Sequence, residues 1–387
     1  YAHRENLAQA GQSQRDGIRR DIIRSSLKFA ETVPQHEKAA LVMGAALEDV
    51  YAMKDYPLAL TTGRKMIETF PNAEQPLRRS AWLVVAHSSF ELKQLKDAEE
   101  GYVNVLQLTP QNDPSREGLV DNLAASIYKQ GEQANQAQDY KTAAEHFLRV
   151  GQVAPTSKIR PAADYDGATA LIQLKEWDRA AQVLLSFRKN HPGHELQPEV
   201  TKKVAHVFEQ AGKLALAAAE YERIETESKD EAVRREALLL AADLYNKANE
   251  QDRALKVYRR YVDQFPHPVE MAVETRNKIA EVLKARNDKA GYLNELKQIV
   301  DADANAGAER TDRTRYLGAT AALVLTEPLY NQFVEIKLVQ PFDKSLQKKK
   351  AALKSANEAF GKLVKYEVGD VTAAATYYIA EIYFNFS

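Results

Sequence analysis

The chain has 387 residues, and its 53 basic and 54 acidic side chains leave a net charge of -1. That balance offers no overall steering field for nucleic acid or an anionic membrane. The chain has no cysteine, which excludes disulfides, thiolate metal sites and a cysteine nucleophile and hints at an oxidising compartment such as a bacterial envelope. No apolar run reaches the roughly 18 residues of a membrane span.

Prolines mark a recurring unit, because each follows a stretch that reads as an amphipathic helix. They are Pro34, Pro71, Pro110, Pro155, Pro192 and Pro266, spaced by 37, 39, 45, 37 and 74 residues. Proline cannot continue a helix interior, so each one predicts a helix end. The spacing therefore predicts a repeat of about 37 residues, with 74 as two repeats.

A small residue stands twelve positions before most of these prolines. These residues are Ala59, Ala98, Ala143, Ala180 and Ala254. Four positions later come Gly63, Tyr102, Phe147, Leu184 and Tyr258. Because a spacing of four keeps two residues on one helical face, we expect the alanine to allow close helix approach and the larger residue to fill the gap beside it.

Another helix is predicted before each of these helices. Trp82, Val85, Ala86 and Ser89 show its apolar face, and Leu238, Ala241, Ala242 and Tyr245 repeat the same offsets. The two helices of a pair are predicted to join through short polar turns at Met53–Asp55, Lys96–Asp97, Lys175–Glu176, Gly212–Lys213 and Glu250–Asp252. The 45-residue spacing before Pro155 predicts an extended first helix around Leu119–Gln138.

The order Trp-x-x-hydrophobic-small-x-x-Tyr, then Ala-x-x-x-aromatic, then Pro, resembles the tetratricopeptide repeat (TPR). The best copies are Trp82–Pro110 and Leu238–Pro266, and the resemblance covers about residues 18–302. It implies an all-α fold, a right-handed superhelix of antiparallel helix pairs. Loosely, the repeats are also similar to those of bacterial envelope TPR proteins.

The pattern changes toward both ends of the chain. Residues 18–33 read as the second helix of a pair, with 1–14 as a remnant of the first, and Val371–Phe386 reads as a first helix. Solenoid ends normally need caps, so we expect the chain to continue there, or to pack against a partner or another copy.

The stretch from Asp303 to Glu367 is predicted to be a looser part of the array. Pro328 and Pro341 are expected to interrupt the helices, and a long helix is expected over Lys344–Tyr366. The predicted organisation is listed in chain order: a partial repeat over 1–34, a TPR array of about seven helix pairs over 35–302, and a diverged repeat with long helices, then the start of a further repeat, over 303–387.

Residues that could carry chemistry are few. No phosphate-binding loop, dinucleotide motif or His-Glu-x-x-His occurs. His191, His194 and Glu195 lie in an inter-repeat turn and are interpreted as a solvated loop rather than a metal site. The basic run around Lys348–Lys350 is interpreted as a solvated helix face, although acidic lipid or nucleic acid is the alternative. We therefore predict no enzyme activity, no catalytic residue, no cofactor and no metal.

The TPR resemblance implies that an extended peptide or a helix binds on the concave face, which the first helix of each pair lines. The offsets that face this groove give the predicted partner-binding residues Glu48, Tyr51, His87, Phe90, Glu91, Tyr165, Thr169, Gln173, Lys202, His206, Glu209, Asp243, Asn246 and Lys247. Of the Lys/Asn/Arg clamp by which some members hold a chaperone C-terminus, only Lys202 is present.

Two functions follow from this pattern. The first is a non-catalytic protein-interaction scaffold, in the periplasm or cell envelope as part of an assembly complex, with a cytoplasmic location as the alternative. The second is a helical regulatory or substrate-recruiting module of a larger protein whose catalytic domain lies elsewhere. In both, the partner is a protein or peptide and not a nucleic acid, and no part of the chain spans a membrane.

Overall fold

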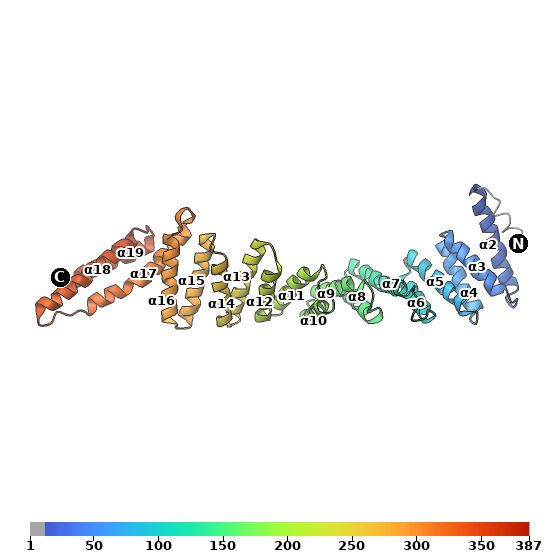
Figure 1. The fold of residues 1–387 in the computed structure, drawn as a ribbon, viewed down its shortest axis with the longest axis horizontal. Coiled ribbons are helices and arrows are strands. Elements are labelled where there is room, and N and C mark those ends of the chain that lie inside the picture. Colours follow the sequence, from blue (N-terminus) through green and yellow to red (C-terminus); the bar gives the residue numbers. More distant parts are fainter. Residues whose placement is uncertain (1–11, 387) are drawn as a thin grey trace. The chain divides into compact units, whose positions relative to one another are not determined.

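A computed structural model describes residues 12–386 of the chain. Within this range the chain is helical throughout, with eighteen α-helices, one short 3-10 helix and no β-strand. Consecutive helices form antiparallel pairs (Figure 1). The all-α fold predicted from the repeats is confirmed. Of the first-helix remnant predicted over residues 1–14, residues 1–11 lie outside the described range.

The chain divides into two compact units, residues 1–200 and 201–387, which we call unit 1 and unit 2. The helices of unit 1 are α2 (Gln12–Thr32), α3 (Ala39–Ala52), α4 (Tyr56–Thr69), α5 (Gln75–Glu91), α6 (Leu95–Gln107), α7 (Arg116–Gln136), α8 (Tyr140–Val153), α9 (Arg160–Gln173) and α10 (Trp177–Asn190). Here α7 is the extended first helix that the long spacing predicted. The division of the repeats at residues 34 and 302 stays a prediction.

The elements of unit 2 begin within α11 (Gln197–Gln210), which starts in unit 1. They continue as α12 (Leu214–Glu227), α13 (Glu231–Lys247), α14 (Gln251–Gln264), α15 (Val269–Ala285), α16 (Lys289–Ala304), η1 (Gly307–Glu309), α17 (Asp312–Glu335), α18 (Phe342–Val364) and α19 (Gly369–Phe386).

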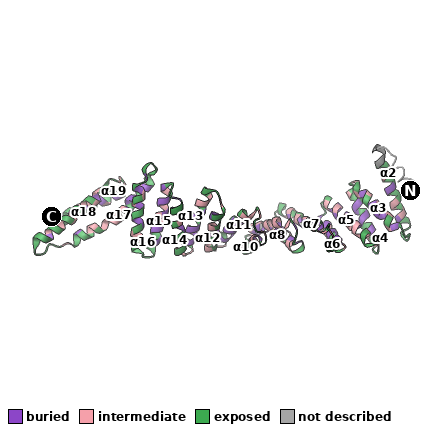
Figure 2. Cartoon of the chain, viewed as in Figure 1, coloured by how far each residue is buried: buried purple, intermediate pink, exposed green. Residues whose placement is uncertain are grey.

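The alanines that the proline spacing predicted lie in the buried core of the repeats. All five alanines, Ala59, Ala98, Ala143, Ala180 and Ala254, have no exposed surface. The residues four positions later, which are Gly63, Tyr102, Phe147, Leu184 and Tyr258, are buried as well. Figure 2 shows that buried positions recur along the helices. In the second repeat Gly101 adds to this close approach, because a Cβ on it would lie 2.8 Å from Cα of Ala86 on α5. Small side chains therefore set how closely the paired helices pack.

The turn inside each pair is built on one residue with positive φ. These residues are Lys54, Lys93, Gln138, Lys175, Gly212, Asn249 and Asn287, with φ between 58° and 70°. The next residue then caps the second helix, and Asp55, Asp139 and Asp288 do so with a side-chain carboxylate. Two turns come earlier than predicted, since α6 begins at Leu95 and α14 at Gln251.

These turns give a stability prediction, because a left-handed conformation costs a residue with Cβ roughly 1–2 kcal/mol and costs glycine little. We expect Lys93→Gly and Lys175→Gly to raise the free energy of unfolding by about 0.5–1 kcal/mol, and Gly212→Ala to lower it by about 1 kcal/mol. Chemical denaturation followed by circular dichroism measures all three. Lys256→Gly inside α14 is the control and should destabilise by about 1 kcal/mol; a loss of the same size at Lys93 would contradict the argument.

The C-terminal part of unit 2 differs from the prediction at one proline. Pro328 lies inside α17 rather than interrupting it, whereas Pro341 is the N-cap of α18 as an interruption requires. Helix α17 packs against both α18 and α19. That tertiary packing offsets the roughly 3 kcal/mol that an internal proline costs.

Candidate protein-binding surface

Half-buried aromatic side chains recur on the first helices of unit 1. We call the set Tyr51, His87, Phe90, Tyr128 and Tyr165 the aromatic row. It draws on α3, α5, α7 and α9, the first helices of four successive pairs. Because each ring packs its body on the protein and shows an edge to solvent, the row offers apolar contact together with polar groups.

His87 is held between two tyrosines from neighbouring elements. The ring of Tyr51 stacks on it with centroids 6.0 Å apart and an angle of 25°. On its other side, Nδ1 of His87 lies 2.7 Å from the hydroxyl of Tyr102, a core residue of α6. Burial lowers the pKa of His87, more than the nearby Glu91 raises it, so the ring is neutral at neutral pH.

Acidic groups surround the aromatic row. Burial raises the pKa of Tyr51, and Tyr56 and Glu91 raise it further. Burial also raises the pKa of Tyr128, as does the carboxylate of Asp166, which accepts a 2.5 Å hydrogen bond from its hydroxyl. The charged groups that raise the pKa of these two tyrosines are thus carboxylates.

Tyr128 and Asp166 were not among the residues predicted from the sequence. Tyr128 is 37 residues before Tyr165 and holds the same position in its repeat. The 37-residue spacing therefore indicates Tyr128 from the sequence, although the extended α7 interrupts the regular spacing of the repeats before it. Asp166 lies next to the predicted Tyr165, and only the fold shows that it reaches the preceding repeat.

The other predicted residues of unit 1 have varied surroundings. Glu48 is exposed and accepts a 2.8 Å hydrogen bond from Ser80 on the next first helix. Phe90 packs partly into the core cluster of its repeat. Thr169 donates to the backbone carbonyl of Tyr165 at 2.9 Å, and Gln173 is exposed at the end of α9.

The predicted residues of unit 2 do not form a comparable set. Lys202, His206 and Glu209 are exposed on α11, and Glu209 accepts a 3.3 Å hydrogen bond from Tyr221. Asp243 is engaged within the fold. Its two oxygens lie 2.8 Å from Nζ of Lys278 on the next first helix, and Tyr258 donates to one of them. Farther along α13, Asn246 is half-buried and Lys247 exposed.

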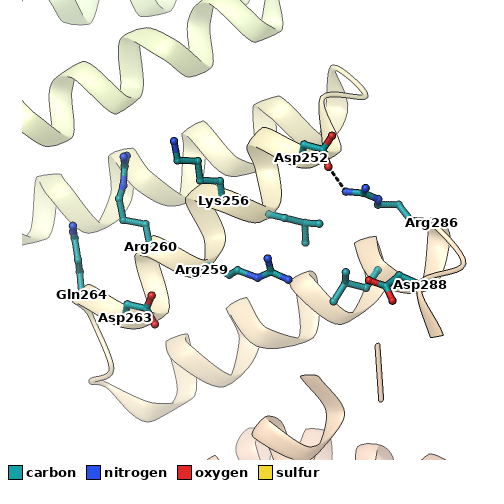
Figure 3. A pocket seen from close by; sticks show the side chains of 10 residues that line it. Asp252, Lys256, Arg259, Arg260, Asp263, Gln264, Arg286 and Asp288 are labelled. Carbon is teal, nitrogen blue, oxygen red and sulfur yellow. Dashed lines mark hydrogen bonds and ion pairs between the residues drawn. The ribbon is translucent and has the colours of Figure 1, made fainter. Parts of the chain in front are cut away.

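A cleft of about 620 Å³ in unit 2 is lined by α14, α15 and the residues after them. Figure 3 shows basic and acidic side chains around this cleft, and Arg286 donates to Asp252 at 2.6 Å. Two basic side chains of this cleft are thus already paired, Arg286 with Asp252 and Arg260 with Glu222, which lowers the charge that they offer to a ligand.

The described residues contain neither a cluster of metal ligands nor a membrane-spanning helix. Within residues 12–386, no group of three or more His, Asp and Glu side chains is placed to hold a metal ion. His191 and His194 instead pack against the edge of Phe187, with ring centroids 5.0 and 5.4 Å away. No helix in the described part of the chain is both long and apolar enough to cross a membrane.

Comparison with known proteins agrees with the repeat pattern. The family model of the tetratricopeptide repeat matches residues 162–194 and 236–267, which cover most of α9 and α13 and all of α10 and α14. Of the two copies predicted as best, Leu238–Pro266 lies in a match and Trp82–Pro110 does not. No curated protein sequence matches the chain.

Several solved structures share the helical repeat fold at low identity. A structure of Naa15/Naa10 bound to HypK-THB is 16% identical with a TM-score of 0.36, over 99% of this chain and 55% of that one. PilF of Pseudomonas aeruginosa is 15% identical with a TM-score of 0.26, over 65% and 95%. YrrB, described as a TPR protein with an unusual peptide-binding site, is 13% identical with a TM-score of 0.29, over 55% and 98%. The chain thus spans about half the length of the first of these proteins, and none of them supports an inference about function.

The fold and the face of first helices define an α-helical repeat protein. The matched segments, residues 162–194 and 236–267, are tetratricopeptide repeats. Such repeats are typically non-catalytic and generally serve protein–protein interaction.

Proposed function

We propose that this protein is a non-catalytic scaffold whose first-helix face in unit 1 binds a peptide or helix carrying both basic and apolar side chains. The observation that carries the proposal is the aromatic row with its flanking carboxylates. Stacked repeats leave such a face open along several units, which suits an extended partner.

The chemistry of the row favours a cationic partner over an acidic one. Lysine and arginine side chains are attracted to the faces of tyrosine and phenylalanine and pair with carboxylates. Glu48 and Glu91 are exposed on the same helices as Tyr51 and His87. Tyr51 and His87 are already stacked, so little side-chain freedom is lost when a partner binds them.

A peptide-selection experiment tests this proposal. Purified protein is offered a peptide library that varies in charge and apolar content, and the affinity of selected peptides is measured by fluorescence anisotropy. We expect peptides with Lys or Arg beside apolar residues to be selected. Glu48→Lys with Glu91→Lys should weaken their binding roughly tenfold or more, because two attractive charges become repulsive.

The matched control places the same charge change on second helices. Glu100 on α6 and Glu145 on α8 are exposed there, so Glu100→Lys with Glu145→Lys should leave the affinity within about twofold. Equal losses in the two variants would show a long-range charge effect and not a site. Selection of acidic peptides would contradict the proposal outright.

We place this scaffold in the bacterial envelope. The lack of cysteine supports that location, and the near-neutral charge supports a protein partner over nucleic acid. Fractionation of cells that produce the full-length protein tests the location, and recovery in the cytoplasm would oppose it. A full-length sequence with a catalytic domain would favour the regulatory-module alternative.

A further inference from the structure

The connection between α17 and α18 exposes a small group of apolar side chains. Leu338, Val339 and Phe342 are 51%, 58% and 58% exposed. The connection forms one end of the group of helices α17, α18 and α19, and Figure 2 draws it largely in the colour of exposed residues. Large apolar side chains exposed together on a projecting loop point to contact with another apolar phase.

The loop that carries these side chains is fixed by hydrogen bonds. The hydroxyl of Ser345, a buried residue of α18, donates to the carbonyl of Val339 at 2.8 Å and accepts from its N–H at 3.2 Å. Both backbone groups of Val339 are thus satisfied within the loop. Val339 can then approach an apolar environment without exposing an unpaired backbone group of its own.

Lysines surround this apolar group at high density. Residues 337–354 contain six lysines and one aspartate, in a chain whose net charge is -1. Lys337, Lys344, Lys348 and Lys350 are exposed and form no salt bridge within the described part of the chain. Lys349 packs 4.8 Å from the ring of Phe333, and Lys354 lies 4.0 Å from Glu358. The end of the helix group is therefore strongly positive, although the chain is not.

The last turn of α19 places an exposed aromatic side chain at the same end of the helix group. The hydroxyl of Tyr378 on α19 donates a hydrogen bond to Glu327 on α17, and the hydroxyl of Tyr330 on α17 donates one to Glu381 on α19. Because both pairs rise along the two helices together, α17 and α19 lie side by side and run in the same direction. The last residues of α19 therefore lie level with the end of α17, and Phe384 there is 78% exposed.

We propose that this basic, apolar end, residues 337–350, binds the surface of an anionic lipid bilayer, with Phe342 and its neighbours entering the interface. Clusters of four to eight lysines beside exposed apolar groups attract anionic headgroups. Lysine is well suited to a lipid surface, because its long stem can lie along the apolar surface while its ammonium group reaches the phosphates.

The positions of the lysines along α18 agree with such a contact. At a rise of about 1.5 Å per residue, Lys344 lies about 3 Å and Lys350 about 12 Å behind Phe342 along the helix. An apolar group that enters the headgroup boundary by about 5–10 Å would place these lysines among the headgroups. The lysines also lie on several sides of the helix, as expected if the helix end meets the bilayer rather than its flank.

Vesicle binding tests the proposal on the whole chain. Vesicles of phosphatidylcholine alone are compared with vesicles of equal parts phosphatidylcholine and phosphatidylglycerol. We expect binding to the anionic vesicles only, weakened by salt. Lys344→Gln, Lys348→Gln and Lys350→Gln together should lower the partition coefficient on the order of 100-fold, and Phe342→Ser by about tenfold or more. The tryptophan emission of Phe342→Trp should shift to the blue on anionic vesicles.

The matched control removes three exposed lysines elsewhere in unit 2. Lys229→Gln, Lys256→Gln and Lys297→Gln together should leave vesicle binding within about threefold. Equal losses in the two triple variants, or no blue shift for Phe342→Trp, would overturn the proposal. Tight binding of soluble polyglutamate with no binding to anionic vesicles would also overturn it and would assign the end to an acidic protein.

Discussion

Replacing Gly101 with alanine is expected to lower the free energy of unfolding by about 2–3 kcal/mol, although alanine is the better helix former. A Cβ at this position would lie 2.7 Å from Cβ and 2.8 Å from Cα of Ala86. Ala86 is itself fully buried on α5, and its backbone cannot turn aside as a flexible side chain could. The two helices must therefore separate, which disturbs the packing of the whole pair.

The matched control for this variant is Gly118→Ala, the same chemical change in an open place. Gly118 lies near the start of α7, and no atom comes within 4 Å of a Cβ built there. Its replacement should raise the free energy of unfolding by about 0.5–1 kcal/mol. Denaturant unfolding of both variants measures the difference, and a stabilising Gly101→Ala would contradict the assigned contact between α5 and α6.

The repeat core could be predicted from the sequence because its causes are local and recur. An alanine at a fixed distance before a proline, as at Ala98 and Pro110, reflects two constraints that one repeat alone imposes: close helix approach and a helix end. Pro328 shows the limit of that reasoning. Its cost is local, but the packing that offsets it comes from α18 and α19, and a pattern within α17 cannot reveal it.

The candidate surface could be predicted only in part for the same reason. Fixed offsets placed Tyr51 and His87 on first helices, and the fold brings their rings into contact. The same offsets placed Asp243 on the surface, but its partner Lys278 is 35 residues away and belongs to another repeat. Contacts between repeats decide which polar residues are engaged within the fold, and they depend on superhelical geometry that composition and spacing do not specify.

Arg310→Met is expected to destabilise unit 2 strongly, because it removes the partner of a buried carboxylate. The side chain of Asp303, at the end of α16, has no exposed surface, and its two oxygens accept hydrogen bonds from Arg310 at 2.9 and 2.7 Å. Removing the guanidinium leaves a buried carboxylate without its cation, which typically costs 3–5 kcal/mol. Because Arg310 is 41% exposed, we expect the lower end, about 3 kcal/mol.

A surface pair on α17, the helix that follows Arg310, provides the control for Arg310→Met. Arg315 pairs with Asp312, whose side chain is 96% exposed, so Arg315→Met should cost no more than about 0.5 kcal/mol. Repeat proteins can unfold locally, so hydrogen exchange in α16 and α17 is measured together with denaturant unfolding. Equal stability of the two variants would show that Asp303 does not depend on Arg310.

A double variant separates loss of the pair from loss of the charge. Thr314 also donates to Asp303 at 2.9 Å, so Asp303→Asn keeps a polar group in place while removing the buried charge. Asp303→Asn with Arg310→Met should therefore be less destabilised than the sum of the two single variants, with a coupling of about 1–3 kcal/mol. Simple additivity would mean that the junction of α16 and α17 is held by packing alone, and that the buried carboxylate is stabilised without the arginine.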